Sequence, residues 1–91
     1  FPQQAVARVH NRFGRLDALI NNAAVAFDGV LATQPPADIK RMIAINITGS
    51  VLMARAATRE FLLMPRESRK SIVNVSSILG IRGFRGLSAY G

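Results

Sequence analysis

Two adjacent serines occupy a position in this chain where side chains can bind a ligand or take part in a reaction. Ser76 and Ser77 come directly after residues 71–75, a short apolar segment with β-branched side chains that is typical of a buried strand. Their hydroxyls therefore lie at the exit of the expected strand, where a parallel sheet presents its ligand-binding groups. A turn or a helix cap is the alternative role of such a pair, and these residues alone leave both roles open.

An asparagine lies in the middle of an otherwise apolar helical stripe. At 100° per residue, Asn46 falls on one face of the helix expected for residues 37–64. A buried amide without partners costs about 1–3 kcal/mol, so Asn46 needs hydrogen bonds. Either a loop or helix backbone provides them, or the helix directs this amide into a polar pocket. The other members of the stripe are Ile39, Met42, Ile43, Ser50, Met53, Ala54, Ala57, Phe61 and Met64.

The composition excludes several kinds of site. The 91 residues include no cysteine, which rules out disulfides, cysteine-bound metals and a cysteine nucleophile within this chain. His10 is the only histidine, so we expect no metal site built from several histidines. Neither a G-x-S-x-G elbow, a G-x-G-x-x-G loop nor a Walker A sequence occurs.

The chain is strongly basic, with a formal net charge of +7. Its arginines are dispersed rather than grouped with aromatic residues, and no nucleic-acid-binding motif is present, so we expect no nucleic-acid partner. Positive charge of this size still attracts anionic ligands such as phosphates. The apolar runs are far shorter than the ~20 residues that span a bilayer, and we expect no membrane segment or signal peptide.

The order of elements predicts a parallel sheet. Residues 3–13 have helical spacing and end before Gly14, residues 16–20 and 71–75 form apolar strands, and residues 37–64 form a long helix that Pro65 closes. Strand, helix and strand in this order make a βαβ unit with a right-handed crossover. The carboxyl ends of the strands, residues 21–24 and 76–77, then meet at the same edge of the sheet.

Two strands and one crossover helix cannot cover both faces of a sheet. We therefore expect the fold class to be α/β, with residues 1–91 forming the central part of a single doubly wound, Rossmann-type parallel-sheet domain.

Three segments resemble one known family, and together they cover nearly the whole chain. Residues 14–24 (GRLDALINNAA) are similar to the G-x-L-D-x-L-I-N-N-A-G segment of short-chain dehydrogenases/reductases. Residues 42–49 (MIAINITG) resemble the helix motif that carries the active-site asparagine of that family. Residues 71–90 resemble its I-V-N-x-S-S…Y segment, with Tyr90 thirteen residues after Ser77. The three motifs occur in the order and at the intervals that the family uses.

The resemblance implies a catalytic role for three residues. Tyr90 would be the general acid that protonates a carbonyl oxygen, Ser77 would hydrogen-bond that oxygen, and Asn46 would join a water-mediated proton relay. A phenol, with an ordinary pKa near ~10, needs a neighbouring cation for this work. The family has a lysine four residues after its tyrosine, a position beyond residue 91.

The resemblance also implies a dinucleotide cofactor. Asn21, Ala23 and Ala24 match the segment along the adenosine side of the cofactor, with Ala24 in place of the usual glycine, and Asn74 matches a structural amide. The family's glycine-rich phosphate loop precedes the segment that this chain matches, so we expect the 91 residues alone to be inactive. The cofactor is expected to be NADP, because residues 71–91 look most like 3-oxoacyl-(acyl-carrier-protein) and carbonyl reductases; NAD is the alternative.

We therefore expect an NAD(P)-dependent reductase acting on a small-molecule or acyl-carrier carbonyl, in the cytoplasm or alternatively in mitochondria. The alternatives are a sugar-alcohol or steroid dehydrogenase and a non-catalytic nucleotide-binding relative. The long helix is also apolar on a second side, which predicts a homodimer or homotetramer. The residues on that second side are Ile45, Val51, Leu52, Leu62 and Leu63.

Overall fold

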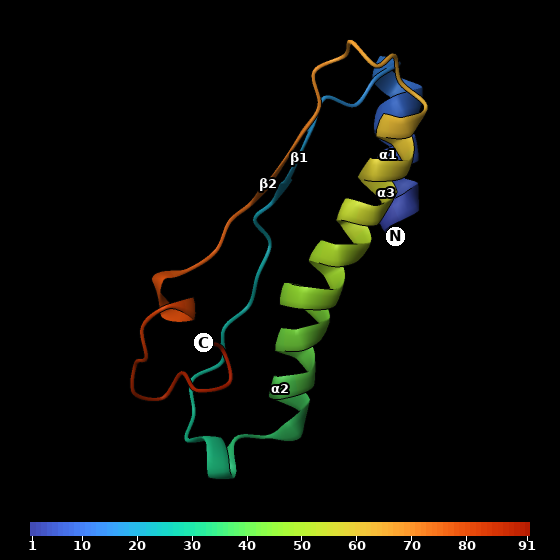
Figure 1. Ribbon diagram of the computed structural model, residues 1–91. Coiled ribbons are helices and arrows are strands. Elements are labelled where there is room, and N and C mark those ends of the chain that lie inside the picture. Colours follow the sequence, from blue (N-terminus) through green and yellow to red (C-terminus); the bar gives the residue numbers. More distant parts are fainter.

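The computed structural model describes residues 1–91 and shows a helix followed by a parallel strand–helix–strand unit (Figure 1). The molecule is elongated, with extents of 49 × 24 × 16 Å. The long helix lies beside the two strands and runs back against their direction, as the crossover in a βαβ unit requires. The loops that follow the two strands come together at the end of the molecule where the long helix begins (Figure 1).

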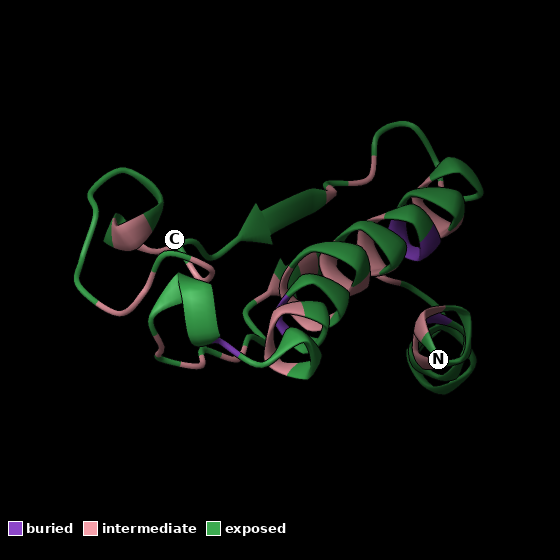
Figure 2. Ribbon diagram, turned by 90° about the horizontal axis from the view of Figure 1, so that it is seen from below, coloured by how far each residue is buried: buried purple, intermediate pink, exposed green.

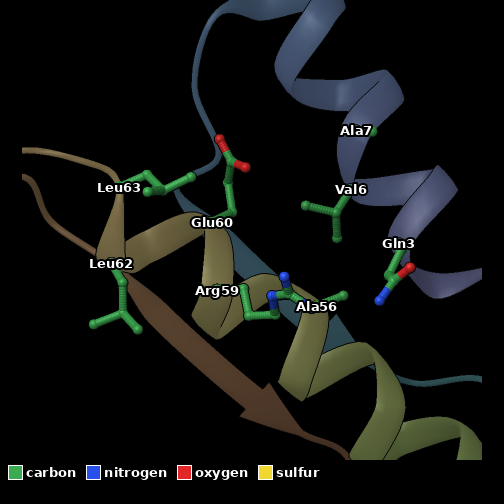
Figure 3. A pocket seen from close by; sticks show the side chains of 8 residues that line it. All are labelled: Gln3, Val6, Ala7, Ala56, Arg59, Glu60, Leu62 and Leu63. Atoms are coloured by element: carbon green, nitrogen blue, oxygen red, sulfur yellow. The ribbon is translucent and has the colours of Figure 1, made fainter.

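Helix α1 spans Pro2–Phe13, in agreement with the predicted residues 3–13. A proline in the first turn is compatible with a helix start because its missing N–H would have no partner there. Gly14 ends the helix with a left-handed φ of 77°, and its N–H donates to the carbonyl of His10 at 2.7 Å. Val6 is the buried residue of α1 and points toward Ala56 (Figure 3).

Strands β1 (Ala18–Asn21) and β2 (Ser71–Asn74) are parallel, and Ala18 pairs with Ser71 at one end while Asn21 pairs with Asn74 at the other. The bounds of the strand predicted over residues 16–20 were partly wrong: Leu16 lies outside β1, and Asn21 lies inside it. The N–H of Val75 still donates to the carbonyl of Asn21 at 2.9 Å. Both strands therefore end at the same level and deliver their following residues to one edge.

The predicted helix over residues 37–64 is present from residue 36 to residue 62, in three segments. Helix α2 spans Pro36–Met42 and α3 spans Ser50–Leu62, and Ile43–Gly49 between them is π-helical, which the sequence pattern did not predict. Neither this helix nor any other in the chain combines the length and the apolar character needed to cross a membrane.

The buried core is small and lies along the helices (Figure 2). Every residue of β2 is exposed within these 91 residues, as expected for two strands and one crossover helix that cannot cover both faces of a sheet. A two-stranded sheet with one helical layer leaves its other face open. Ile43 was predicted to face the core but is 49% exposed. It is the first residue of the π-helical segment, whose wider turns change the direction of side chains relative to an α-helix with 100° per residue. The buried apolar residues are Val6, Met42, Ala56 and Ala57.

Candidate active site

A cavity of about 400 Å³ lies at the carboxyl ends of β1 and β2. All six predicted site residues line it, although they come from three separate stretches of the chain. The structure therefore brings together the two loops and the helix that the sequence analysis had placed at this edge of the sheet. The predicted residues are Asn21, Ala23, Ala24, Asn46, Ser77 and Tyr90, and the cavity is also lined by Asn22, Ile47, Ser50, Val75, Ser76, Gly80 and Gly91.

Of the two roles that the sequence had left open for Ser77, the structure shows the capping role and also places the residue on the cavity. It precedes a short 3₁₀-helix, Ile78–Gly80, and its Oγ accepts a hydrogen bond from the N–H of Leu79 at 3.2 Å. This capping bond occupies one lone pair of the oxygen and leaves the hydroxyl proton available as a donor. The side chain of Ser77 is thus held by the backbone of Leu79, and Ser77 lines the cavity.

Tyr90 reaches the cavity from the segment that follows the 3₁₀-helix. Its ring is half-buried, and the next residue, Gly91, donates its N–H to the carbonyl of Leu87 at 2.8 Å. This bond closes a turn around Tyr90. The phenol of Tyr90 and the hydroxyl of Ser77 therefore border the same cavity, although thirteen residues separate them in the chain.

Asn46 lies in the π-helical segment, and its side chain is held by the loop that follows β1. Its Oδ1 accepts from the N–H of Val25 at 2.9 Å, and its Nδ2 donates to the carbonyl of Val25 at 2.8 Å. This pair of bonds supplies the partners that a half-buried amide needs. The side chain thus joins the helix to the loop, and π-helical turns are frequent at functional sites.

Asn21 has a similar structural connection at the end of the sheet. Its Nδ2 donates to Oδ1 of Asn74 at 2.9 Å and to the carbonyl of Ser50 at 3.2 Å, which uses both amide protons. The prediction that Asn74 is a structural amide is therefore consistent with its contacts. Toward a ligand, Asn21 can still offer its Oδ1 as a hydrogen-bond acceptor.

Ala23 and Ala24 are exposed at the rim of the cavity. Ala24 stands where the motif that this segment resembles has a glycine, and its backbone is not strained, because only Gly14 and Gly86 have positive φ angles. Methyl side chains leave the backbone of this segment open to close approach by a flat ligand. The residues present thus fit a dinucleotide lying along this rim.

The lining of the cavity is uncharged. Its proton-bearing side chains are the hydroxyls of Ser50, Ser76, Ser77 and Tyr90 together with the amides of its asparagines. Such a site can donate hydrogen bonds to an oxygen that becomes negative during a reaction, and a phenol can also transfer a proton.

A larger cavity of about 580 Å³ lies between α1 and α3, but it has a different character (Figure 3). Its polar lining includes the carboxylate of Glu60, whose Oε1 lies 2.5 Å from Nδ1 of His10. Apolar side chains and the long stems of Gln3 and Arg59 form the remainder. This cavity is a gap between two packed helices and contains no hydroxyl group.

Sequence reasoning missed the contacts that hold the site loops together. The N–H of Gly29 donates to the carbonyl of Gly86 at 2.8 Å, and the buried Gln34 supports the same loop by donating to the carbonyl of Phe27 at 2.7 Å. The glycines were visible in the sequence as turn signals. Their pairing was not, because residue types do not show which of two distant loops meet.

Comparison with known proteins identifies the family of this chain. A family model described as short chain dehydrogenase matches residues 2–91. The chain belongs to the short-chain dehydrogenase family, and the expectation of an α/β chain of Rossmann type is confirmed.

Individual relatives show how wide this family is. The chain is 33% identical over 88 residues to a 3-oxoacyl-(acyl-carrier-protein) reductase of Bos taurus, covering 97% of this chain and 36% of the relative. It superposes on the structure of ElxO with NADP bound with a TM-score of 0.86 and 32% identity, covering 98% of this chain and 35% of ElxO. The match to NAD⁺-bound xylitol dehydrogenase has a TM-score of 0.87 and 30% identity, covering 99% and 34% of the two chains. The chain thus spans about a third of the length of the curated relatives that it matches.

Proposed function

We propose that the complete protein is an NAD(P)H-dependent oxidoreductase that reduces a carbonyl group to an alcohol. The observation that carries this proposal is the single cavity in which Ser77, Tyr90 and the Ala23–Ala24 segment meet. The similarity to reductases and dehydrogenases of the same family supports it.

The side chains of the cavity have separate tasks in this reaction. When bound, NAD(P)H supplies the hydride that adds to the carbonyl carbon. The hydroxyl of Ser77 donates a hydrogen bond to the carbonyl oxygen, where negative charge develops, and this donor is already oriented by its bond from Leu79. Tyr90 then gives its phenolic proton to that oxygen, which completes the alcohol, and solvent returns a proton to the phenolate.

Asn46 serves the reaction through the architecture of the site. Its side chain fixes Val25 and thereby the loop that continues from Ala23 and Ala24. We propose that the proton path from solvent to Tyr90 passes along this part of the helix, where Asn46 and Ile47 border the cavity.

The rim formed by Ala23 and Ala24 is the proposed contact for the cofactor, and Asn21 holds this rim on the sheet. The proposed cofactor is NADP(H), supported by the likeness to ElxO with NADP bound. The xylitol dehydrogenase structure holds NAD⁺ and favours the alternative. Titrating the complete protein with NADPH and NADH, followed by cofactor fluorescence, decides between them; tighter NADH binding contradicts the NADP(H) assignment.

The proposed substrate is a 3-oxoacyl thioester or a similar carbonyl compound, in line with the bovine relative. A sugar-alcohol dehydrogenase is the second candidate, because the match to xylitol dehydrogenase is of equal quality. Initial rates with acetoacetyl-CoA and NADPH, compared with rates for xylitol and NAD⁺, separate the two. The proposed partners are small molecules and further copies of the same chain. The location in the cytoplasm or in mitochondria stays a prediction.

The replacement of Tyr90 by phenylalanine tests the proposed function. Tyr90→Phe removes the proton donor and keeps the ring, so we expect turnover to fall by about 10²–10⁴-fold, the usual contribution of general acid catalysis. Cofactor affinity and melting temperature should stay close to those of the unmodified protein. Wild-type turnover in Tyr90→Phe contradicts the catalytic assignment, and loss of turnover accompanied by unfolding calls for the same test with Ser77→Ala.

A further inference from the structure

The two loops that form the cavity touch at a second point, away from the sheet. After β1 and β2 separate, the N–H of Gly29 donates to the carbonyl of Gly86 at 2.8 Å, and Gly29 forms an isolated parallel bridge with Leu87. In Figure 1 the segment before the first 3₁₀-helix and the C-terminal segment run together near the C-terminus. We call this contact between Gly29 and residues 86–87 the loop bridge.

Glycine stands on both sides of the loop bridge, and the backbone angle of Gly86 favours it. Gly86 has a φ of 79°, which side chains with a Cβ rarely adopt, and a Cβ there would lie 4.0 Å from the nitrogen of Gly29. A Cβ on Gly29 would lie 3.2 Å from Cδ of Gln34, closer than an ordinary van der Waals contact. A side chain at Gly86 would strain the backbone, and a side chain at Gly29 would press on Gln34.

The loop that carries Gly29 is itself fixed from two sides. Gln34 is 6% exposed, and its Nε2 donates to the carbonyl of Phe27 at 2.7 Å. Asn46 binds both backbone polar groups of Val25. Gly29 is thus presented to Gly86 by a supported loop.

The loop bridge leads directly to Tyr90. The N–H of Leu87 donates to the carbonyl of Phe84 at 3.2 Å, and the carbonyl of Leu87 accepts from the N–H of Gly91 at 2.8 Å. Tyr90 lies within this last turn, whose first residue is the bridged Leu87. Moving Leu87 would therefore move the turn that holds the phenol.

We propose that the loop bridge positions Tyr90 in the cavity, with Gly86 as the positioning residue. This inference rests on the proposed function, because it assigns to Gly86 an effect on the proton donor of that reaction. A displacement of about 1 Å at a reacting group can lower turnover by ~10²-fold. Gly86 touches neither substrate nor cofactor in this account and acts through Tyr90.

A matched pair of glycine substitutions in the complete protein tests the proposal. Gly86→Ala and Gly14→Ala both place a Cβ on a backbone with positive φ, 79° and 77°, and nothing lies within 4 Å of the Cβ built on Gly14. We expect both to lower the melting temperature, but only Gly86→Ala to lower kcat, by about 10- to 100-fold, with unchanged NADPH affinity. Gly83→Ala, whose Cβ also meets nothing, controls for changes within the same loop and should keep wild-type kcat.

Combining Gly86→Ala with Tyr90→Phe separates positioning from general damage. If Gly86 acts through the phenol, its substitution has no further effect on the residual rate of Tyr90→Phe. Losses that multiply in the double variant overturn the proposal, as does equal kcat in Gly86→Ala and Gly14→Ala. Wild-type turnover of Tyr90→Phe alone instead contradicts the proposed function.

A second double variant applies if Gly86→Ala does not fold. Gly29→Ala should lower kcat because its Cβ meets Gln34, and Gln34→Ala removes that obstacle while losing the bond to Phe27. The double variant should therefore have a kcat no lower than that of Gln34→Ala. A kcat equal to the product of the two separate losses overturns the inference.

Discussion

The structural role of Ser77 and its proposed chemical role use different parts of one hydroxyl group. As an acceptor it caps the 3₁₀-helix through the N–H of Leu79, and Ser77 also lines the cavity, where its proton is the proposed donor. The two functions use different parts of the group, since a hydroxyl has two lone pairs and one proton. Their losses should therefore appear in different measurements.

Ser77→Ala is expected to reduce turnover by about 10²–10³-fold, the usual effect of removing one donor to a developing oxyanion. Loss of the cap should also lower the free energy of unfolding by ~0.5–2 kcal/mol. Steady-state kinetics and urea unfolding measure the two effects separately. Ser88→Ala, at an exposed position two residues before Tyr90, serves as the control and should leave both unchanged. A stability loss with full turnover in Ser77→Ala would leave only the capping role.

At the residue scale, the sequence pointed to residues that line one cavity but not to most of their hydrogen-bond partners. Ser77, Tyr90 and Asn46 stand in motifs with fixed intervals, and the structure places all three on one cavity. The bond from Asn46 to Val25 was not predictable, because any buried amide needs a partner and many loop backbones qualify. The contact between Gly29 and Gly86 was missed for the same reason.

At the scale of elements, the long helix is tied to the loop after β1 in the segment where its hydrogen bonding changes. Asn46 lies in the π-helical stretch Ile43–Gly49 and holds Val25 by two bonds. Ser50, the first residue of α3, accepts from Asn21 through its carbonyl. Helix and sheet are thus joined at two levels close to the cavity.

Asn46→Leu is expected to lower the free energy of unfolding by about 1–3 kcal/mol, because it leaves two partly buried polar groups of Val25 without partners. Turnover should fall as well, since the loop next to Ala24 loses its support. Asn46→Asp keeps the acceptor for the N–H of Val25, so its free energy of unfolding in urea should lie between that of the unmodified protein and that of Asn46→Leu. Thr48→Ala, exposed in the same segment, is the control. Unchanged stability of Asn46→Leu would contradict the structural role of this side chain.

The elements themselves followed from the sequence to within about two residues. Gly14 marked the end of α1 correctly, because a glycine adopts the left-handed backbone angles found there. The π-helical segment left no signal, since its residue types are compatible with an ordinary α-helix. β1 begins at Ala18, two residues later than expected. Residue types alone do not show where a strand begins, because pairing with β2 decides which residues belong to it.

At the scale of the whole molecule, the helix is exposed on the side that the sequence analysis singled out. Val51 is 62% exposed, Leu62 is 78% exposed and Leu63 is 83% exposed. Figure 3 shows Leu62 pointing away from α1, so α1 does not cover it. Apolar side chains presented in this number on one helix favour burial against a further surface. A second copy of the helix across a two-fold axis can supply such a surface, because the same patch then covers itself.

We therefore predict that the complete protein is a homodimer or homotetramer that is assembled through this side of α3, and Leu52→Glu tests it. Leu52 is 44% exposed, and a carboxylate at a buried apolar contact would have no partner, so assembly should shift toward monomer. Sedimentation velocity at micromolar concentration measures the change. Asn11→Glu places the same charge on an exposed position of α1 and should keep the wild-type mass. If another part of the same chain covers this side of the helix instead, the wild-type protein sediments as a monomer and Leu52→Glu lowers its stability without changing its mass.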